Sequence, residues 1–212
     1  MDIKYQMRNK VLIISSEFPP GPGGIGNHAF NISNELNKRG YQIIINTISD
    51  YADENREVSF DRDCSFKVYR FKRCNFTLLT WVQRLKTIRE TIIRYKIETV
   101  IISGRFPIWI IPFIKFYKNI NILTVVHGTE LGRTIFLKWT LFCLKKSDKI
   151  ISVSNFTRSL LPEKLKLNAS VINNGVNLKR WNNIPESYEL DNYPILLTVG
   201  TISLRKGQYN VI

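Results

Sequence analysis

The 212-residue chain has the composition of a globular protein and a strongly basic charge balance. Hydrophobic residues make up 44% and charged residues 23%, which excludes a disordered or fibrous chain. The length fits one large α/β domain, or one domain with part of another. A formal net charge of +14 favours partners that carry phosphate, such as nucleotides, lipid-linked sugars or an anionic membrane. The plainer alternative, a Lys-rich protein without such a partner, stays open.

The cysteines and the N-terminus exclude several protein classes. Cys64, Cys74 and Cys143 are odd in number and lack metal-ligand spacing, which argues against a disulfide framework and a zinc site. The first ten residues are polar and of mixed charge, unlike a signal peptide. The most apolar stretch, residues 106–117, is shorter than the ~20 residues that a membrane-spanning helix needs. We therefore expect a cytoplasmic protein, with peripheral contact at the inner face of a membrane as an open alternative.

Short β-branched runs alternate with longer amphipathic ones along the chain. This alternation predicts βαβ units, a mainly parallel sheet and a Rossmann-like three-layer α/β fold. In the first third we expect strands over residues 11–15 and 41–48, a Pro/Gly-rich loop over 17–26 and a helix over 27–38. Residues 50–63 are polar without periodicity and predict a loop. Residues 66–71 alternate and fit an antiparallel or edge strand.

A longer helix opens the next part of the chain. Its apolar positions are separated by four, three, four and three residues and form one stripe: Trp81, Leu85, Ile88, Ile92 and Tyr95. Basic residues surround this stripe, so the pattern favours a core-packing helix with a solvated basic face over a membrane-surface helix. Further strands are expected over residues 98–103, 121–126, 149–153 and 170–172, and helices over 134–145 and 156–161.

The pattern changes towards the C-terminus. Residues 179–193 are rich in Asn, Pro, Glu and Ser, which is typical of a linker. A fresh strand starts at Pro194, and the sequence ends at Ile212. We therefore expect one domain over residues 1–178, an interdomain linker over 179–193, and the first strand and loop of a truncated second domain over 194–212.

The loop after the first strand formally matches G-x-G-x-x-G over residues 21–26, with Asp50 near the end of the second strand. Two features argue against a dinucleotide site. Five residues separate the strand from the first glycine, and Pro19, Pro20 and Pro22 remove amide donors from the loop. The remaining interpretation is more general: Gly23 and Gly24 allow close approach of a ligand, and the next helix directs free N–H groups at an anion. A plain strand-to-helix turn is the structural alternative.

Five segments in order resemble family-4 retaining glycosyltransferases of the GT-B fold. The first runs from Lys-Val-Leu-Ile-Ile-Ser-Ser-Glu-Phe-Pro-Pro-Gly-Pro-Gly-Gly at residues 10–24 to Arg-Gly-Tyr-Gln-Ile-Ile-Ile at residues 39–45. The others are Thr-Val-Val-His-Gly-Thr-Glu at 124–130, Ser-Asp-Lys-Ile-Ile-Ser-Val-Ser-Asn-Phe-Thr-Arg at 147–158, Val-Ile-Asn-Asn-Gly-Val-Asn at 171–177 and Leu-Thr-Val-Gly-Thr at 197–201, which continues to Lys-Gly at 206–207. Each motif alone is weak, whereas five in this order are specific.

The resemblance implies two Rossmann-like domains with the active site between them, of which this chain holds the acceptor side. It places His127 against the donor sugar as a catalytic residue. It also places Gly23, Gly24, Lys206 and Arg205 near the diphosphate, where fixed positive charge stabilises the leaving group. Glu130 and Arg105 are candidates for cleft contacts with an acceptor. Ser154 and Asn155 either line the cleft or cap a helix.

The expected reaction is transfer of a hexose-type sugar from a nucleotide sugar to a glycan or lipid-linked acceptor of the cell surface, without a metal or other cofactor.

Three departures from the family pattern stand out. Thr201 replaces a common arginine, Asn177 replaces an aspartate, and the E-x7-E carboxylates lie beyond the sequence. We therefore expect weak or no transfer by this chain alone, and a C-terminal domain as partner. A non-catalytic glycan- or anionic-lipid-binding domain and an NAD(P)-dependent oxidoreductase are the alternatives. Nucleic acid is not expected as a partner, because the basic residues are dispersed.

Overall fold

The computed structural model describes residues 10–49, 53–72, 77–132, 135–175 and 207–208. The chain divides into two compact units, Met1–Asn174 and Gly175–Ile212. All helices and strands given below belong to the first unit. The predicted linker over residues 179–193 lies outside the described residues, as does the strand predicted after it. The domain boundaries therefore stay predictions.

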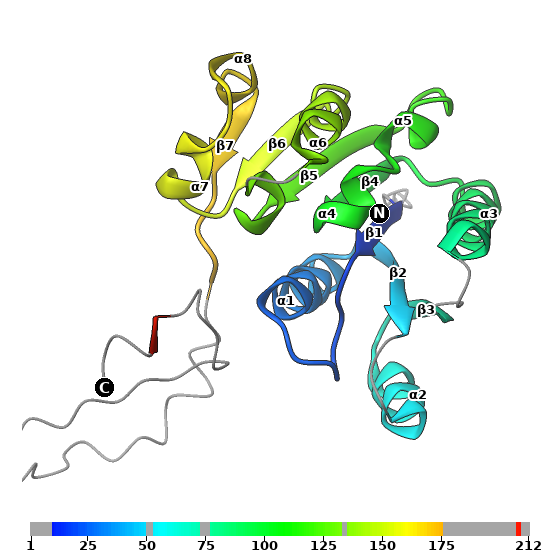
Figure 1. Cartoon of the computed structure of the whole chain (residues 1–212). Coiled ribbons are helices and arrows are strands. Elements are labelled where there is room, and N and C mark those ends of the chain that lie inside the picture. The colour runs from blue at the N-terminus through cyan, green and yellow to red at the C-terminus, as the bar shows by residue number, and fades with distance from the viewer. Residues whose placement is uncertain (1–9, 50–52, 73–76, 133–134, 176–206, 209–212) are drawn as a thin grey trace, which may run out of the picture. The chain divides into compact units, whose positions relative to one another are not determined.

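Seven strands form one sheet in which every neighbouring pair is parallel. Their order across the sheet is β3-β2-β1-β4-β5-β6-β7 (Figure 1). The strands are β1 (Lys10–Ser15), β2 (Gln42–Ser49), β3 (Lys67–Lys72), β4 (Thr99–Ser103), β5 (Asn121–Val126), β6 (Lys149–Ser152) and β7 (Ala169–Val171). The chain turns to opposite sides of β1 for β2 and β4, and this reversal marks the place where such sheets bind ligands. The expected Rossmann-like parallel sheet is confirmed.

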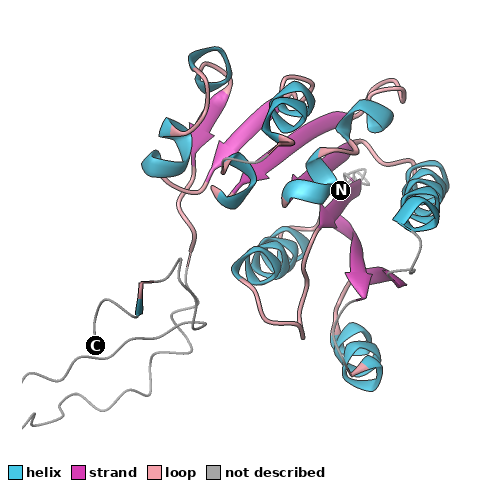
Figure 2. Ribbon diagram, viewed as in Figure 1, coloured by secondary structure: helices cyan, strands magenta, loops and turns pink. Residues whose placement is uncertain are grey.

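Helices cover both faces of the sheet and complete three layers (Figure 2). On one face lie α1 (Gly24–Lys38) and α2 (Glu54–Asp63). Towards the other face pack α3 (Thr77–Tyr95), α4 (Arg105–Ile108), α5 (Ile111–Ile114), the 3-10 turn η1 (Thr129–Leu131), α6 (Leu137–Leu144) and α8 (Glu163–Lys166). Between β6 and α8 runs α7 (Asn155–Ser159). Sequence reasoning placed α1, α3, α6 and α7 within a few residues of these bounds.

The sheet supplies two cores because successive side chains of a strand point to opposite faces. Leu12 and Ile14 of β1 face the core beneath α3 to α6, whereas Val11 and Ile13 face the core beneath α1. All four side chains are almost fully buried. A strand that is apolar on both faces is typical of a parallel sheet covered on both sides.

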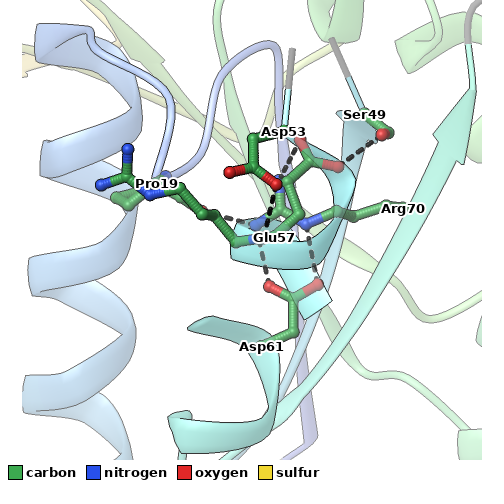
Figure 3. A network of polar contacts seen from close by, with 7 residues as sticks. Pro19, Ser49, Asp53, Glu57, Asp61 and Arg70 are labelled. Atoms are coloured by element: carbon green, nitrogen blue, oxygen red, sulfur yellow. Dashed lines mark hydrogen bonds and ion pairs between the residues drawn. The ribbon is translucent and has the colours of Figure 1, made fainter. Parts of the chain in front are cut away.

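The prediction of a loop over residues 50–63 is wrong for residues 54–63, which form α2. Asp53 caps this helix, and its carboxylate accepts a hydrogen bond from the backbone N–H of Arg56 at 3.1 Å. The buried side of α2 carries Glu57 and Asp61, which pair with Arg70 of β3 (Figure 3). Because charged, ion-pairing side chains occupy this side of α2, the sequence lacks the periodic apolar stripe from which helices are predicted.

The strand expected over residues 66–71 lies at the edge of the sheet, as one of the two alternatives had it. It runs parallel to β2, so the antiparallel alternative is wrong. The apolar stretch after β4 folds into the two short helices α4 and α5, which sequence analysis did not predict. Pro107 and Pro112 lie within these helices of four residues each, where little helical periodicity develops.

The stability of this sheet depends on its central strands. Replacing fully buried Ile102 of β4 by Ala should lower the free energy of unfolding by about 2–5 kcal/mol, because the cavity left behind cannot collapse. The matched control is Val58→Ala on α2, whose side chain is 58% exposed and whose removal should change stability by less than about 0.5 kcal/mol. Urea denaturation followed by circular dichroism measures both variants; similar losses for the two would contradict the assignment of the core.

Candidate functional site

The carboxyl ends of β1, β4 and β5 lie side by side at one edge of the sheet, because these neighbouring strands are parallel. At the ends of β1 and β4, the backbone N–H of Ser16 donates to the carbonyl of Ser103 at 3.0 Å. Gly104 has φ of 95°, and a Cβ at this position would overlap the Ser16 hydroxyl. Glycine is required here both by the backbone conformation and by the close approach.

His127 directly follows β5 and is held from two sides. Its Nε2 lies 2.9 Å from the Ser103 hydroxyl, and its backbone N–H donates to Glu130 Oε2 at 3.0 Å. The ring of His28, from the first turns of α1, meets the His127 ring edge to face with centroids 4.9 Å apart. The structure thus brings the predicted catalytic residue against the N-terminal part of the helix that follows the glycine loop.

Both histidines are neutral at physiological pH. Burial lowers the pKa of His127 to about 4, and burial together with the nearby His127 lowers the pKa of His28 to about 4. Each ring nitrogen of a neutral imidazole either donates or accepts a hydrogen bond, depending on which of the two carries the proton, and Nε2 of His127 already meets Ser103. His127 can therefore bind a hydroxyl without adding positive charge to the site.

Glu130 and Arg105, predicted to contact an acceptor, both hold the turn after β5. The Glu130 side chain is buried, and burial raises the pKa of its carboxyl although backbone N–H groups and Arg105 oppose the shift. Its second oxygen, Oε1, has no hydrogen-bond partner among the described residues. Arg105 donates to the backbone carbonyl of Thr129. The structure assigns these two side chains contacts with the turn itself, and contact with an acceptor stays a prediction.

The two predicted glycines of the loop differ in their surroundings. Gly23 has φ of 157°, and a Cβ there would overlap the Glu17 carboxylate, whereas a Cβ on Gly24 would meet nothing within 4 Å. Within the described ranges no side chain caps the N-terminus of α1, and the first turn of this helix holds no acidic residue. This helix end presents N–H groups of the kind that bind anions, and the Glu17 carboxylate lies beside it at Gly23.

Arg70 ties the glycine loop to the edge of the sheet (Figure 3). Its guanidinium donates to the Pro19 carbonyl in the loop and to Asp61 at 2.7 and 2.8 Å. It also pairs with Glu57 at 3.3 Å, and both side chains are largely buried. One cation thereby fixes α2, β3 and the loop that leads to Gly23.

Ser154 and Asn155 begin α7 at the end of β6. The Ser154 hydroxyl accepts from the backbone N–H of Thr157 at 3.0 Å, so Ser154 is a helix cap, one of the two alternatives left open. Asn155 is exposed. A Cβ on Gly128 would lie 3.5 Å from the Thr157 hydroxyl, which places α7 beside the His127 turn.

A cavity of about 120 Å³ lies at the carboxyl end of β1 and is lined by Ser16 and Arg84 among others. The Arg84 guanidinium stacks 3.7 Å from the centre of the Phe106 ring and 4.5 Å from that of Phe71. Arg84 is only 5% exposed. Stacking between aromatic rings fixes the orientation of this cation in the cavity wall.

Several predicted features fall outside these observations. Arg205 and Lys206, the predicted diphosphate ligands, lie outside the described residues, as do Asn177 and Thr201. Among the described residues, no three His, Cys, Asp or Glu side chains gather as metal ligands. Within the same ranges, no helix combines the length and apolarity that crossing a membrane demands.

Sequence reasoning missed Ser103, His28, Glu17 and Arg70. The polar end of β4 was a usable signal for Ser103, since it must lie beside the end of β5 in a parallel sheet. No local pattern could have indicated His28 or Arg70, because their contacts depend on packing between distant segments.

Comparison with known proteins places the chain in a family. The family described as Glycosyltransferase Family 4 matches residues 22–180. The chain belongs to this family. The match includes Gly23, Gly24, His127 and α7, whereas β1 and Ser16 lie before its first residue. No curated protein sequence matches the chain significantly.

Solved structures with the same fold include a glycosyltransferase from Rickettsia africae, at 20% identity and a TM-score of 0.63 over 85% of this chain and 47% of that one. Anabaena Alr3699/HepE in complex with UDP has 14% identity and a TM-score of 0.60, over 83% and 47%. The lipopolysaccharide outer core galactosyltransferase WaaB has 13% identity and a TM-score of 0.55, over 80% and 46%. This chain of family 4 has the GT-B-type Rossmann-like fold and spans about half the length of these proteins.

The environment of the two histidines predicts a clear pH response. Because the chain has two histidines, its imidazole NMR signals can be assigned with His28→Gln and His127→Gln variants. Both signals should titrate near pH 4, and His28 should titrate at higher pH in the His127→Gln variant. The unfolded chain takes up these protons below about pH 6.5, so the free energy of unfolding should fall as pH drops from about 6.5 to about 4. Midpoints near 6.5 would contradict the buried pair.

The loop glycines allow a matched pair of substitutions. Gly23→Ala should lower the free energy of unfolding by about 1–3 kcal/mol, because its backbone conformation and Glu17 both oppose a side chain. Gly24→Ala has open space at a helix start and should change stability by less than about 1 kcal/mol. If Gly24 lies against a ligand, the same Gly24→Ala substitution should still weaken nucleotide binding, which calorimetry measures. Equal stability losses for the two variants would contradict the loop geometry.

Proposed function

We propose that this chain is the acceptor-side domain of a retaining glycosyltransferase. The enzyme transfers a hexose-type sugar from a nucleotide sugar to a glycan or lipid-linked acceptor of the cell surface. The observation that carries the proposal is the contact of His127 with His28, since it joins the end of β5 to the N-terminal part of α1. A sugar bound at His127 would then have its diphosphate within reach of the N-terminus of α1.

The chemistry of glycosyl transfer fits these groups. The transition state resembles an oxocarbenium ion, and negative charge accumulates on the departing diphosphate. Fixed N–H groups and the positive end of a helix dipole stabilise that charge without reorganisation. In this proposal the N-terminus of α1 supplies them, so a metal ion is not needed for charge neutralisation. Arg205 and Lys206 remain the predicted partners of the same diphosphate.

His127 would hold the transferred sugar. A neutral imidazole whose Nε2 already meets Ser103 keeps a fixed orientation and would offer its other ring nitrogen, Nδ1, to a sugar hydroxyl. The Glu17 carboxylate borders the loop at Gly23 and would accept hydrogen bonds from hydroxyls of a sugar bound beside the loop. His127 and Glu17 would thus approach the sugar from different segments of the site.

The acceptor would enter at the end of β1. The cavity there presents the Ser16 hydroxyl and the stacked Arg84 guanidinium, which are groups that bind sugar hydroxyls and phosphates. Anabaena HepE carries UDP in its crystal structure, and WaaB is a lipopolysaccharide galactosyltransferase. These relatives support a uridine nucleotide as the first donor to test and a surface glycan as the acceptor class.

The test uses protein expressed from the complete reading frame, a panel of UDP-, GDP- and ADP-sugars, and glycan and lipid-linked acceptors. Transfer should appear with one nucleotide class, and NMR of the product should show the anomeric configuration of the donor. His127→Ala should lower kcat/KM by about 10²–10³, as loss of one positioned hydrogen bond does.

The matched control is His28→Asn, a change of the neighbouring histidine that should cause a clearly smaller loss. Absence of transfer from every nucleotide sugar would contradict the proposed function. An inverted product would contradict the retaining mechanism alone. Unchanged kcat/KM in His127→Ala would contradict the role of His127.

A further inference from the structure

Helix α3 carries exposed apolar side chains on the side that faces away from the core. Leu78, Val82 and Ile93 are 65%, 55% and 57% exposed. They follow a helical stripe in which Lys86 and Arg89 are also exposed. This differs from the solvated basic face that the sequence predicts. Exposed apolar residues in such a row indicate a binding surface rather than scattered surface residues.

The stripe borders a groove between α3 and the segment around α5. The groove has a volume of about 390 Å³, and Val82, Leu85, Phe113 and Phe116 contribute apolar walls. Phe116 is 82% exposed, and Phe113 is 45% exposed. Lys86 and Arg89 line the same groove, so its apolar floor has a basic rim.

The neighbouring helix α6 extends this pattern. Trp139 and Phe142 are 43% and 44% exposed, and their rings stack with centroids 5.2 Å apart. The ammonium of exposed Lys146 lies 5.6 Å from the centre of the Phe142 ring. Because α3, α5 and α6 all pack on the same face of the sheet, the exposed aromatic and basic side chains belong to one helix layer (Figure 1).

We propose that this layer, with the α3–α5 groove at its centre, docks on an anionic lipid bilayer. Charge complementarity selects the partner: α3 has the exposed basic residues Lys86, Arg89 and Arg94 against the acidic Glu90, and α6 has Lys138 with no acidic residue. Apolar side chains beside lysine and arginine suit the boundary between headgroups and acyl chains, where tryptophan also concentrates. The groove receives part of an acyl chain while the rim contacts lipid phosphates. This inference does not depend on the proposed glycosyl transfer.

The experiment is co-sedimentation of the 212-residue chain with vesicles of phosphatidylcholine alone or mixed with phosphatidylglycerol, at low and high salt. The chain should bind the anionic vesicles, and binding should fall steeply with salt. The double variant Phe113→Ser/Phe116→Ser should bind at least tenfold more weakly. Its control, Val58→Ser, changes an exposed apolar residue of α2 on the opposite face of the sheet and should bind like the parent chain.

A second pair of variants isolates the charge. Lys86→Gln/Arg89→Gln should lose about fivefold in affinity for each removed charge. Arg39→Gln/Arg62→Gln removes two exposed charges elsewhere and should lose clearly less. Circular dichroism confirms that all variants are folded.

Three results would overturn the proposal. One is absence of binding to anionic vesicles at low salt. Another is equal binding of the groove variant and the Val58→Ser control. The third is a concentration-dependent dimer in size-exclusion chromatography that Phe113→Ser/Phe116→Ser abolishes, because the face would then join two copies of the chain.

Discussion

Just beyond the last residues of β1 and β4, Ser16 packs so closely on Gly104 that no side chain fits at that position. The hydrogen bond from the Ser16 N–H to the Ser103 carbonyl continues the ladder one step past the strand ends. A side chain on Gly104 would separate the strands and shift Ser103, and with it the hydroxyl that meets His127. The glycine loop leaves from Ser16, so its starting point depends on the same contact.

The two sides of the candidate site are held by different means. On the β5 side, a buried carboxylate and backbone hydrogen bonds fix the turn at His127. On the β1 side, the long loop before Gly23 has no regular structure of its own, and the buried Arg70 anchors it instead. Ion pairs are strong where the surroundings have a low dielectric constant, and removing one member of a buried pair leaves the charge of the other member uncompensated. Glu57, Asp61 and Arg70 therefore act as one unit in positioning the loop.

Most of the helices and strands could be predicted, because the spacing of apolar residues indicates their type and glycines mark where they end. The strand over residues 121–126 was placed at its observed bounds, and α1 and α3 followed from their stripes. Helix α2 could not be predicted, since its buried side is acidic and its stabilising cation lies on a later strand. His127 and the two glycines came from motifs within single segments. Ser103 and His28 required knowing which segments meet, and the outer face of α3 required knowing which apolar residues the core leaves uncovered.

The position of Arg70 has a consequence for the motions of the site. Arg70 belongs to β3, which has a neighbour on one side only and lies at the sheet edge. Edge elements open locally at lower free energy than central strands do. Each such opening would release the Pro19 carbonyl and leave the glycine loop without its anchor. The shape of the site therefore depends on local opening of the edge strand β3, although the site itself is built on the central strands.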